Sequence, residues 1–149
     1  MSKASDLALA ISTRIEQITI ANGYATDIGV RVFRGRGSLN RVDLPCIVMV
    51  EGDETVQDAK YANLKSDVVF VLEGHDTCDP LHPNDKGHLI VADLKRAIFG
   101  GDLTLGGMLA KKDDLAYRGR AIGVRPDGGD VIAASISIAV TMVDNLATP

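Results

Sequence analysis

The clearest hydrophobic pattern lies in residues 131–143, where apolar side chains alternate strictly with small or weakly polar ones. Alternation with a period of two is typical of a β-strand that buries one face. The other predicted face carries Ser135 and Ser137 among small residues, which suits close packing against a second surface. The predicted core positions of this strand are Ile132, Ala134, Ile136, Ile138, Val140 and Met142.

Residues 26–33 also alternate and predict a half-buried strand, followed by a basic, glycine-rich loop. The short apolar run 46–50 predicts a strand that begins after Leu44-Pro45, since proline is tolerated at the first strand position. Residues 51–60 are polar and acidic, and Gly52-Asp53 offers a turn within them, although residues 46–56 are also a candidate partner for the next strand in a hairpin.

Residues 61–72 predict a further strand with apolar side chains on both faces, which indicates cover on both sides. Residues 115–124 predict a strand that forms a hairpin with 131–143 through the turn sequence Pro126-Asp127-Gly128-Gly129. In strand 61–72, one face carries Leu64, Val68, Phe70 and Leu72, and the other carries Val69 and Val71.

Two segments have the apolar spacing of amphipathic helices. Residues 5–22 carry apolar side chains every three or four positions, with Ser5 as the expected N-cap and Asn22-Gly23 as the stop. Asn84 is the expected cap of a second helix that runs to Phe99. The apolar stripe of the second helix consists of Ile90, Val91, Leu94, Ala97 and Ile98.

These elements predict an α+β fold, a mostly antiparallel sheet of about five strands with two helices packed on one face. At 149 residues the chain is long enough for one domain with its own core, and residues 144–149 read as a short tail. The chain has no apolar run of 18 residues, so no membrane-spanning helix is expected, and its first residues lack a signal-peptide pattern.

Charged residues are distributed unevenly along the chain. Sixteen Lys and Arg against 20 Asp and Glu give a net charge of −4, which argues against a strongly basic nucleic-acid-binding protein. Basic side chains gather in the loop that carries Arg31, Arg34, Arg36 and Arg41. Acidic side chains gather in residues 51–58, and a second basic group lies on or near strand 115–124, at Arg118, Arg120 and Arg125.

Catalytic chemistry finds little support. A metal-ligand cluster is conceivable in the connector before the second helix, but its spacing matches no familiar zinc pattern. The loop at Arg34 lacks the lysine and the following helix of a phosphate-binding loop. We therefore expect no catalytic residue, metal or cofactor, and we expect the thiols of Cys46 and Cys78 to be reduced. The potential ligands of the connector are His75, Asp76, Cys78, Asp79, His82 and His88.

The order of these features resembles that of the tail terminator (tail completion, or minor tail) proteins of long-tailed bacteriophages and prophages. The resemblance covers residues 5–145 and depends on order and spacing, not on one specific motif. Its marks are the first helix ending at Asn22-Gly23, the strand Thr26-Asp27-Ile28-Gly29-Val30 running into Arg34-Gly35-Arg36, the Leu44-Pro45 strand entry, the acidic middle, the helix segment Ala92-Asp93-Leu94-Lys95-Arg96-Ala97-Ile98, and the C-terminal strand with its tail.

The resemblance implies a structural protein without enzymatic activity, a homo-oligomeric ring that is typically a hexamer. Such a ring caps the tail tube, stops its polymerisation and offers a surface to the head–tail connector protein. The implied partners are other copies of the chain, the tail tube protein and the connector protein, with DNA only passing through the lumen and no membrane involved. The implied location is the virion tail, assembled in the bacterial cytoplasm.

Rings of identical subunits need complementary surfaces, and the residues suggest where these lie. The basic loop and the acidic stretch have opposite charge, so they are candidates to meet across a subunit boundary, and the small-residue face of strand 131–143 is a candidate to lie against a neighbour. The candidate interface residues are Arg34, Arg36, Arg41, Asp53, Glu54, Asp58, Ser135 and Ser137.

Three alternatives stay open at the level of sequence. The first is another virion component, either a head–tail joining protein or a tail-tube subunit. The second is a small metal-dependent enzyme that uses His75, Cys78, His82 and His88. The third is a ligand-binding α+β module with an unknown partner.

Overall fold

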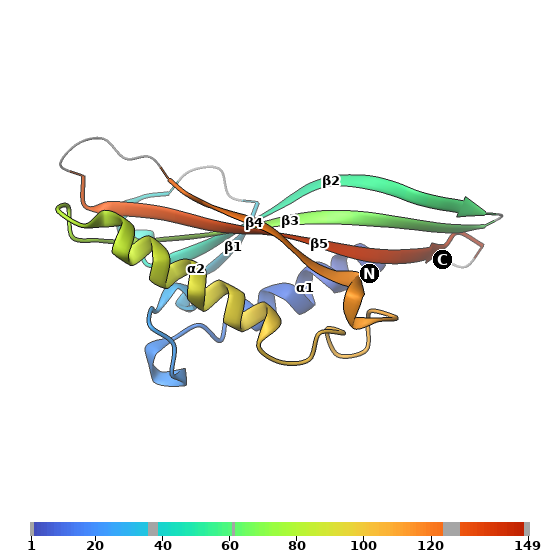
Figure 1. Ribbon diagram of the computed structural model, residues 1–149, viewed down its shortest axis with the longest axis horizontal. Coiled ribbons are helices and arrows are strands. Elements are labelled where there is room, and N and C mark those ends of the chain that lie inside the picture. The colour runs from blue at the N-terminus through green and yellow to red at the C-terminus, as the bar shows by residue number, and fades with distance from the viewer. Residues whose placement is uncertain (1, 36–38, 61, 124–128, 148–149) are drawn as a thin grey trace.

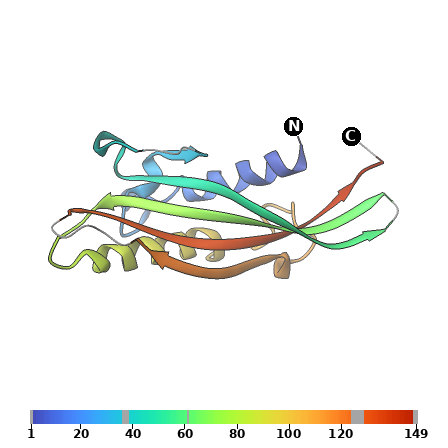
Figure 2. The same ribbon diagram turned by 90° about the horizontal axis from the view of Figure 1, so that it is seen from above.

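The protein folds into one five-stranded sheet with two α-helices, as a computed structural model that describes residues 2–35, 39–60, 62–123 and 129–147 shows. The predicted α+β class is confirmed. Across the sheet the strand order is β1-β2-β3-β5-β4, with β1 parallel to β2 and every other pair antiparallel (Figure 2). The strands are β1 (Val32–Arg34), β2 (Cys46–Lys60), β3 (Asn63–Thr77), β4 (Leu115–Ile122) and β5 (Val131–Asn145).

The two central strands pair along their whole length. β3 and β5 are each 15 residues long, and their register runs without a shift from Asn63 opposite Asn145 to Thr77 opposite Val131. The predicted alternation of β5 is confirmed, because its six expected core positions are all buried. This unbroken ladder fixes which side chains of the neighbouring strands share each face of the sheet.

Both helices pack on the same face of the sheet, as predicted (Figure 1). The helices are α1 (Lys3–Ile15) and α2 (Pro83–Phe99). The predicted stripe of α2 is confirmed, with Ala97 half-buried and its other members buried. The core between helices and sheet also contains Leu7, Ile11, Ile15, Ile47, Met49, Phe70, Leu72, Ile136 and Ile138.

The first helix is shorter than predicted and begins earlier. Its N-cap is Ser2, whose hydroxyl accepts a hydrogen bond from the Ser5 amide, so the prediction of Ser5 as N-cap is wrong. The helix ends at Ile15, not at residue 22, and Ile18 reaches the core from the turn that follows. The β-branched run from Ile18 to Ile20 has low helix propensity, which favours this early end. Gly23 does adopt a left-handed conformation, but it closes the short 3₁₀ turn Ile20–Asn22.

The predicted strand 26–33 is mostly wrong. Residues Ile28–Val30 form a 3₁₀ turn and only Val32–Arg34 pair as a strand. The reason is a close approach of two backbones, in which the Gly29 amide donates to the Ile18 carbonyl at 2.8 Å. A Cβ at position 29 would lie 2.4 Å from the Ile15 carbonyl oxygen, so only glycine fits here.

The second strand is far longer than predicted, because the acidic residues 51–60 continue it. No turn forms at Gly52-Asp53, and the chain instead absorbs register shifts between Glu51 and Glu54 and between Val56 and Asp58. Such shifts are β-bulges, which let a strand bend while its pairing continues. β2 and β3 thus form one long hairpin, and β3 runs to Thr77 through the start of the predicted connector 74–84.

Smaller corrections concern the ends of other elements. Helix α2 begins at Pro83 with His82 as its N-cap residue, and Asn84 is inside its first turn. Proline suits the first helical position because its missing N–H has no partner there. Strand β4 ends at Ile122 and β5 runs on to Asn145. The predicted turn 126–129 lies largely outside the described residues.

A buried carboxylate anchors the segment between α1 and β1. Asp93 of α2 is buried and accepts hydrogen bonds from the amides of Ala25 and Thr26, at 3.1 and 2.8 Å, and from the Thr26 hydroxyl at 2.7 Å. A buried charge is tolerated when its lone pairs are filled in this way. Asp93 therefore holds the irregular segment against the helix, where Ile28 enters the core.

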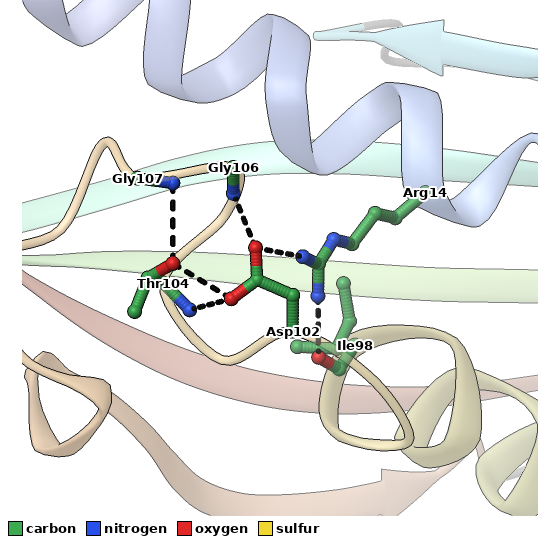
Figure 3. A network of polar contacts seen from close by, with 6 residues as sticks. All are labelled: Arg14, Ile98, Asp102, Thr104, Gly106 and Gly107. Atoms are coloured by element: carbon green, nitrogen blue, oxygen red, sulfur yellow. Dashed lines mark hydrogen bonds and ion pairs between the residues drawn. The ribbon is translucent and has the colours of Figure 1, made fainter.

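The glycine-rich segment after α2 is organised by Asp102 (Figure 3). Its carboxylate accepts from the Thr104 hydroxyl at 2.6 Å, the Thr104 amide at 2.9 Å and the Gly106 amide at 2.9 Å, and lies 3.9 Å from Arg14 of α1. The Thr104 hydroxyl, these amides and Arg14 together lower the pKa of Asp102. The segment is thus fixed beneath the core, with Leu105 and Leu109 buried.

Substitution of Gly29 by alanine tests the close approach described above. The added methyl group would clash with backbone atoms of Ile15 and Ile18, so we expect a loss of about 1–3 kcal/mol in the free energy of unfolding. The measurement is urea unfolding followed by circular dichroism. Gly101→Ala is the matched control, because a Cβ at this exposed position meets nothing within 4 Å. Equal stabilities of the two variants would contradict this packing.

Candidate subunit interface

One face of the sheet carries no α-helix among the described elements, and we call it the outer face (Figure 1). Cross-strand register places Ser135 on it beside Glu73 and Ala121, and Ser137 beside Val71 and Gly119. Both serines are half-buried. The predicted small-residue face therefore exists, and its contact with a second protein surface stays a prediction.

One end of the outer face is closed by the segment that precedes β2. The Arg41 guanidinium donates two hydrogen bonds to the Asp130 carboxylate, at 2.8 and 2.6 Å, a bidentate pair that ties this segment to the start of β5. Below it, Cys46 and Val48 are buried although they point away from the helices. Arg41 thus has a partner within its own chain.

Of the other two basic residues predicted at the interface, Arg34 lies in the described part of the chain and Arg36 does not. Arg34 ends β1 and lies 3.9 Å from Glu51 of β2, a long ion pair between two exposed side chains. Arg36 lies outside the described residues. An ion pair between the basic loop and the acidic stretch therefore forms within one chain at Arg34, whereas the predicted pairing across a subunit boundary stays a prediction.

Asp67 connects all four long strands at the outer face, a role that sequence reasoning missed. It belongs to β3 and accepts hydrogen bonds from Thr141 of β5 and from Gln57 of β2, the latter at 2.7 Å, and it lies 3.8 Å from Arg118 of β4. The Thr141 hydroxyl is the main reason that the pKa of Asp67 is lowered, with Gln57 second. Partners 10 to 74 positions away along the chain leave no local signal in the sequence.

The β2–β3 hairpin projects beyond the helices, accompanied by the end of β5 (Figures 1 and 2). Every side chain of β2 from Val50 to Lys60 is exposed. The predicted interface residues Asp53, Glu54 and Asp58 all lie in this exposed part of β2, where Glu54 lines a hollow beside Leu7 of α1. Within the described residues none of the three forms an ion pair. We call residues 50–60 of β2 the acidic projection, because four acidic residues there outnumber one lysine, although Lys65 of β3 lies opposite Asp58.

The opposite edge of the sheet is β4, and it is basic. It contains Arg118 and Arg120 and no acidic residue, and both arginines are exposed. The Nη1 atom of Arg120 lies 3.0 Å from Nδ1 of His88 on α2, so its polar partner is an imidazole and not a carboxylate. Arg125, the third member of this predicted group, lies outside the described residues.

The potential metal ligands of the connector do not come together. His75 points to the outer face near Glu73, whereas Asp76 is buried on the core face near Lys86, at 3.5 Å. His82 precedes α2 and His88 lies beside Arg120. Within residues 2–35, 39–60, 62–123 and 129–147, no three His, Cys, Asp or Glu side chains are placed to hold one metal ion.

Comparison with known proteins gives no further assignment, because no family model and no curated protein matches the sequence. None of the helices in the described part of the chain is long and apolar enough to cross a membrane.

The lowered pKa of Asp67 predicts acid-sensitive stability. A carboxylate whose folded pKa lies below its unfolded value, about 3.9, stabilises the fold above that value and loses this effect as the pH falls toward the folded pKa. We expect the stability advantage of the wild type over Asp67→Asn to shrink below about pH 4, as measured by urea unfolding between about pH 6 and pH 2.5. Thr141→Val removes the main donor and should reduce the pH dependence of the wild type. Identical pH profiles for the wild type and Asp67→Asn would contradict this role.

Proposed function

We propose that this chain is a structural subunit of a homo-oligomeric ring that acts as a phage tail terminator. In this role the ring, expected to be a hexamer, binds the end of a finished tail tube, stops its growth and offers its other side to the head–tail connector. Tail tube protein and connector protein are the proposed partners, and DNA only passes through the lumen. We propose no enzymatic activity for it and place it in the virion tail, assembled in the host cytoplasm.

The observation that carries this proposal is that much of the sheet is not covered by the described helices and strands of its own chain. The two α-helices cover the core face only, and every side chain of β2 from Val50 to Lys60 is exposed. The tip of the β2–β3 hairpin extends past both α-helices (Figure 1). Among the described strands, β2 from Val50 onward pairs with β3 alone, so its other side is an open edge, and open strand edges attract further strands. Surfaces of this kind favour a protein that works by contact with other protein chains.

The shape of these surfaces favours a ring over a two-fold dimer. The acidic projection and the basic strand β4 lie at opposite edges of the sheet, so they are different surfaces. Contacts between different surfaces of identical subunits are heterologous, and they produce closed rings or open filaments. The resemblance of the sequence to tail terminators favours the closed form.

A tube-growth experiment tests the proposed function. Tail-tube protein of a candidate host phage or prophage is polymerised with and without this chain, and tube lengths and tube ends are examined by electron microscopy. We expect short tubes with one extra ring at one end. Added bovine serum albumin at equal mass concentration is the control for non-specific crowding.

Two other outcomes would contradict the proposal. Co-polymerisation of the chain along the whole tube would identify a tail-tube subunit instead. Unchanged tube lengths, with none of this protein bound to tube ends, would contradict the tail-terminator function.

A further inference from the structure

The sheet has two open strand edges in the described structure, one on each side. β1 pairs with β2 only at Ile47, Val48 and Met49, so from Val50 onward β3 is the only described strand that pairs with β2. At the other side, β4 is the last strand of the sheet and pairs with β5 alone. Each open edge presents backbone N–H and C=O groups that another strand can bind.

These edges carry opposite charge on the same face of the sheet. Arg120 is opposite Ile136, and Glu54 is opposite Val68, which places both charged residues on the helix-covered side. Glu54 has no ion pair among the described residues, and the polar contact of Arg120 is with His88. A second copy that continues the sheet would bring these two side chains to one face, where Glu54 gains a cationic partner and Arg120 gains a carboxylate beside its contact with His88.

Strand direction permits this continuation. Successive antiparallel pairs β2–β3, β3–β5 and β5–β4 make β4 antiparallel to β2 within one chain. Copies related by rotation about an axis roughly along the strands keep their strand directions. The β4 strand of one copy therefore meets the β2 strand of the next as an antiparallel pair, and the alternation of the sheet continues from copy to copy.

We propose that subunits of this protein join by antiparallel pairing of β4 (Leu115–Ile122) with the exposed part of β2, residues 50–60, of the next copy. Arg120 and Glu54 form the charge pair of this junction on the helix-covered face. The inference rests on the proposed ring and specifies its interface.

The bulges on both edges fit a selective junction. β2 has two register shifts in this part, and β4 has one between Tyr117 and Gly119. Bulges and charged side chains are common devices that prevent indiscriminate pairing of open edges. Opposite charges on the two edges oppose β2–β2 and β4–β4 contacts through repulsion while they favour β4–β2 contacts. Head-to-tail assembly follows from that preference.

Charge reversal in two separate chains tests the junction. Arg120→Glu and Glu54→Lys each place like charges across it, so we expect each variant alone to lose the ring at a protein concentration where the wild type is fully assembled. Mixing the two variants should restore the ring. In an alternating ring, each Glu at position 120 meets a Lys at position 54, and each wild-type Arg120 meets a wild-type Glu54. Light scattering after size exclusion reports the mass in each case.

Matched controls separate this effect from misfolding. Glu16→Lys makes the same charge change at an exposed position that follows α1 and belongs to neither β2 nor β4, and should leave the ring intact. Circular dichroism confirms that both test variants fold, since Arg120 and Glu54 are exposed. Unfolded chains could not form a ring after mixing, so the return of the ring shows that both variants are folded.

The failures of this inference and of the proposed function are distinguishable. Rings that persist in both single variants, or that do not return on mixing, would overturn the β4–β2 junction while the tail-terminator function stands. A wild-type chain that stays monomeric alone and on tail tubes would overturn both.

Discussion

The unbroken antiparallel ladder between β3 and β5 is the interaction on which the rest of the structure depends. Because these 15-residue strands pair from end to end, they divide every neighbouring side chain between a core face and an outer face. The ladder also extends past both helices, so it carries the β2–β3 hairpin out into solvent. Strand pairing, and not hydrophobic cover, therefore determines how far the sheet reaches.

Three carboxylates hold the segments that the β3–β5 ladder does not pair. Asp93 holds the irregular segment before β1 against α2, Asp102 fixes the segment after α2, and Asp67 joins β2, β4 and β5 to β3 on the outer face. Each carboxylate has several hydrogen-bond donors, which is how charged groups stabilise irregular or half-buried positions. The core face is thus closed, whereas the open edges of β4 and of the exposed part of β2, and the outer face beyond the Arg41 segment, carry no helix or strand among the described elements. A continuous sheet through several subunits would place the helices on one side of a ring wall and the small-residue face on the other.

The sequence predicted best where one physical effect dominates. Strict alternation in β5 and the apolar stripe of α2 reflect burial against one core, and both predictions are confirmed. Sequence patterns predict the secondary structure poorly where a strand is fully exposed or where two backbones pack closely. Residues 51–60 of β2 have no buried face, so their strand leaves no alternation to detect, and Gly29 shows its close contact with Ile18 only in three dimensions. The outer face with Ser135 and Ser137 was predictable, but the partners of Arg41 and Asp67 were not, since Asp130 and Thr141 lie 89 and 74 positions away.

The central claim is that identical chains assemble head to tail into a closed ring. The most direct measurement is the absolute mass of the wild-type protein in solution, by light scattering after size exclusion, over a range of protein concentrations and at low salt, where charge complementarity is least screened. A closed head-to-tail ring predicts one discrete species of about six times the 15.8 kDa chain mass that does not grow further as concentration rises. A two-fold dimer, or a mass that rises continuously with concentration, would contradict a closed head-to-tail ring.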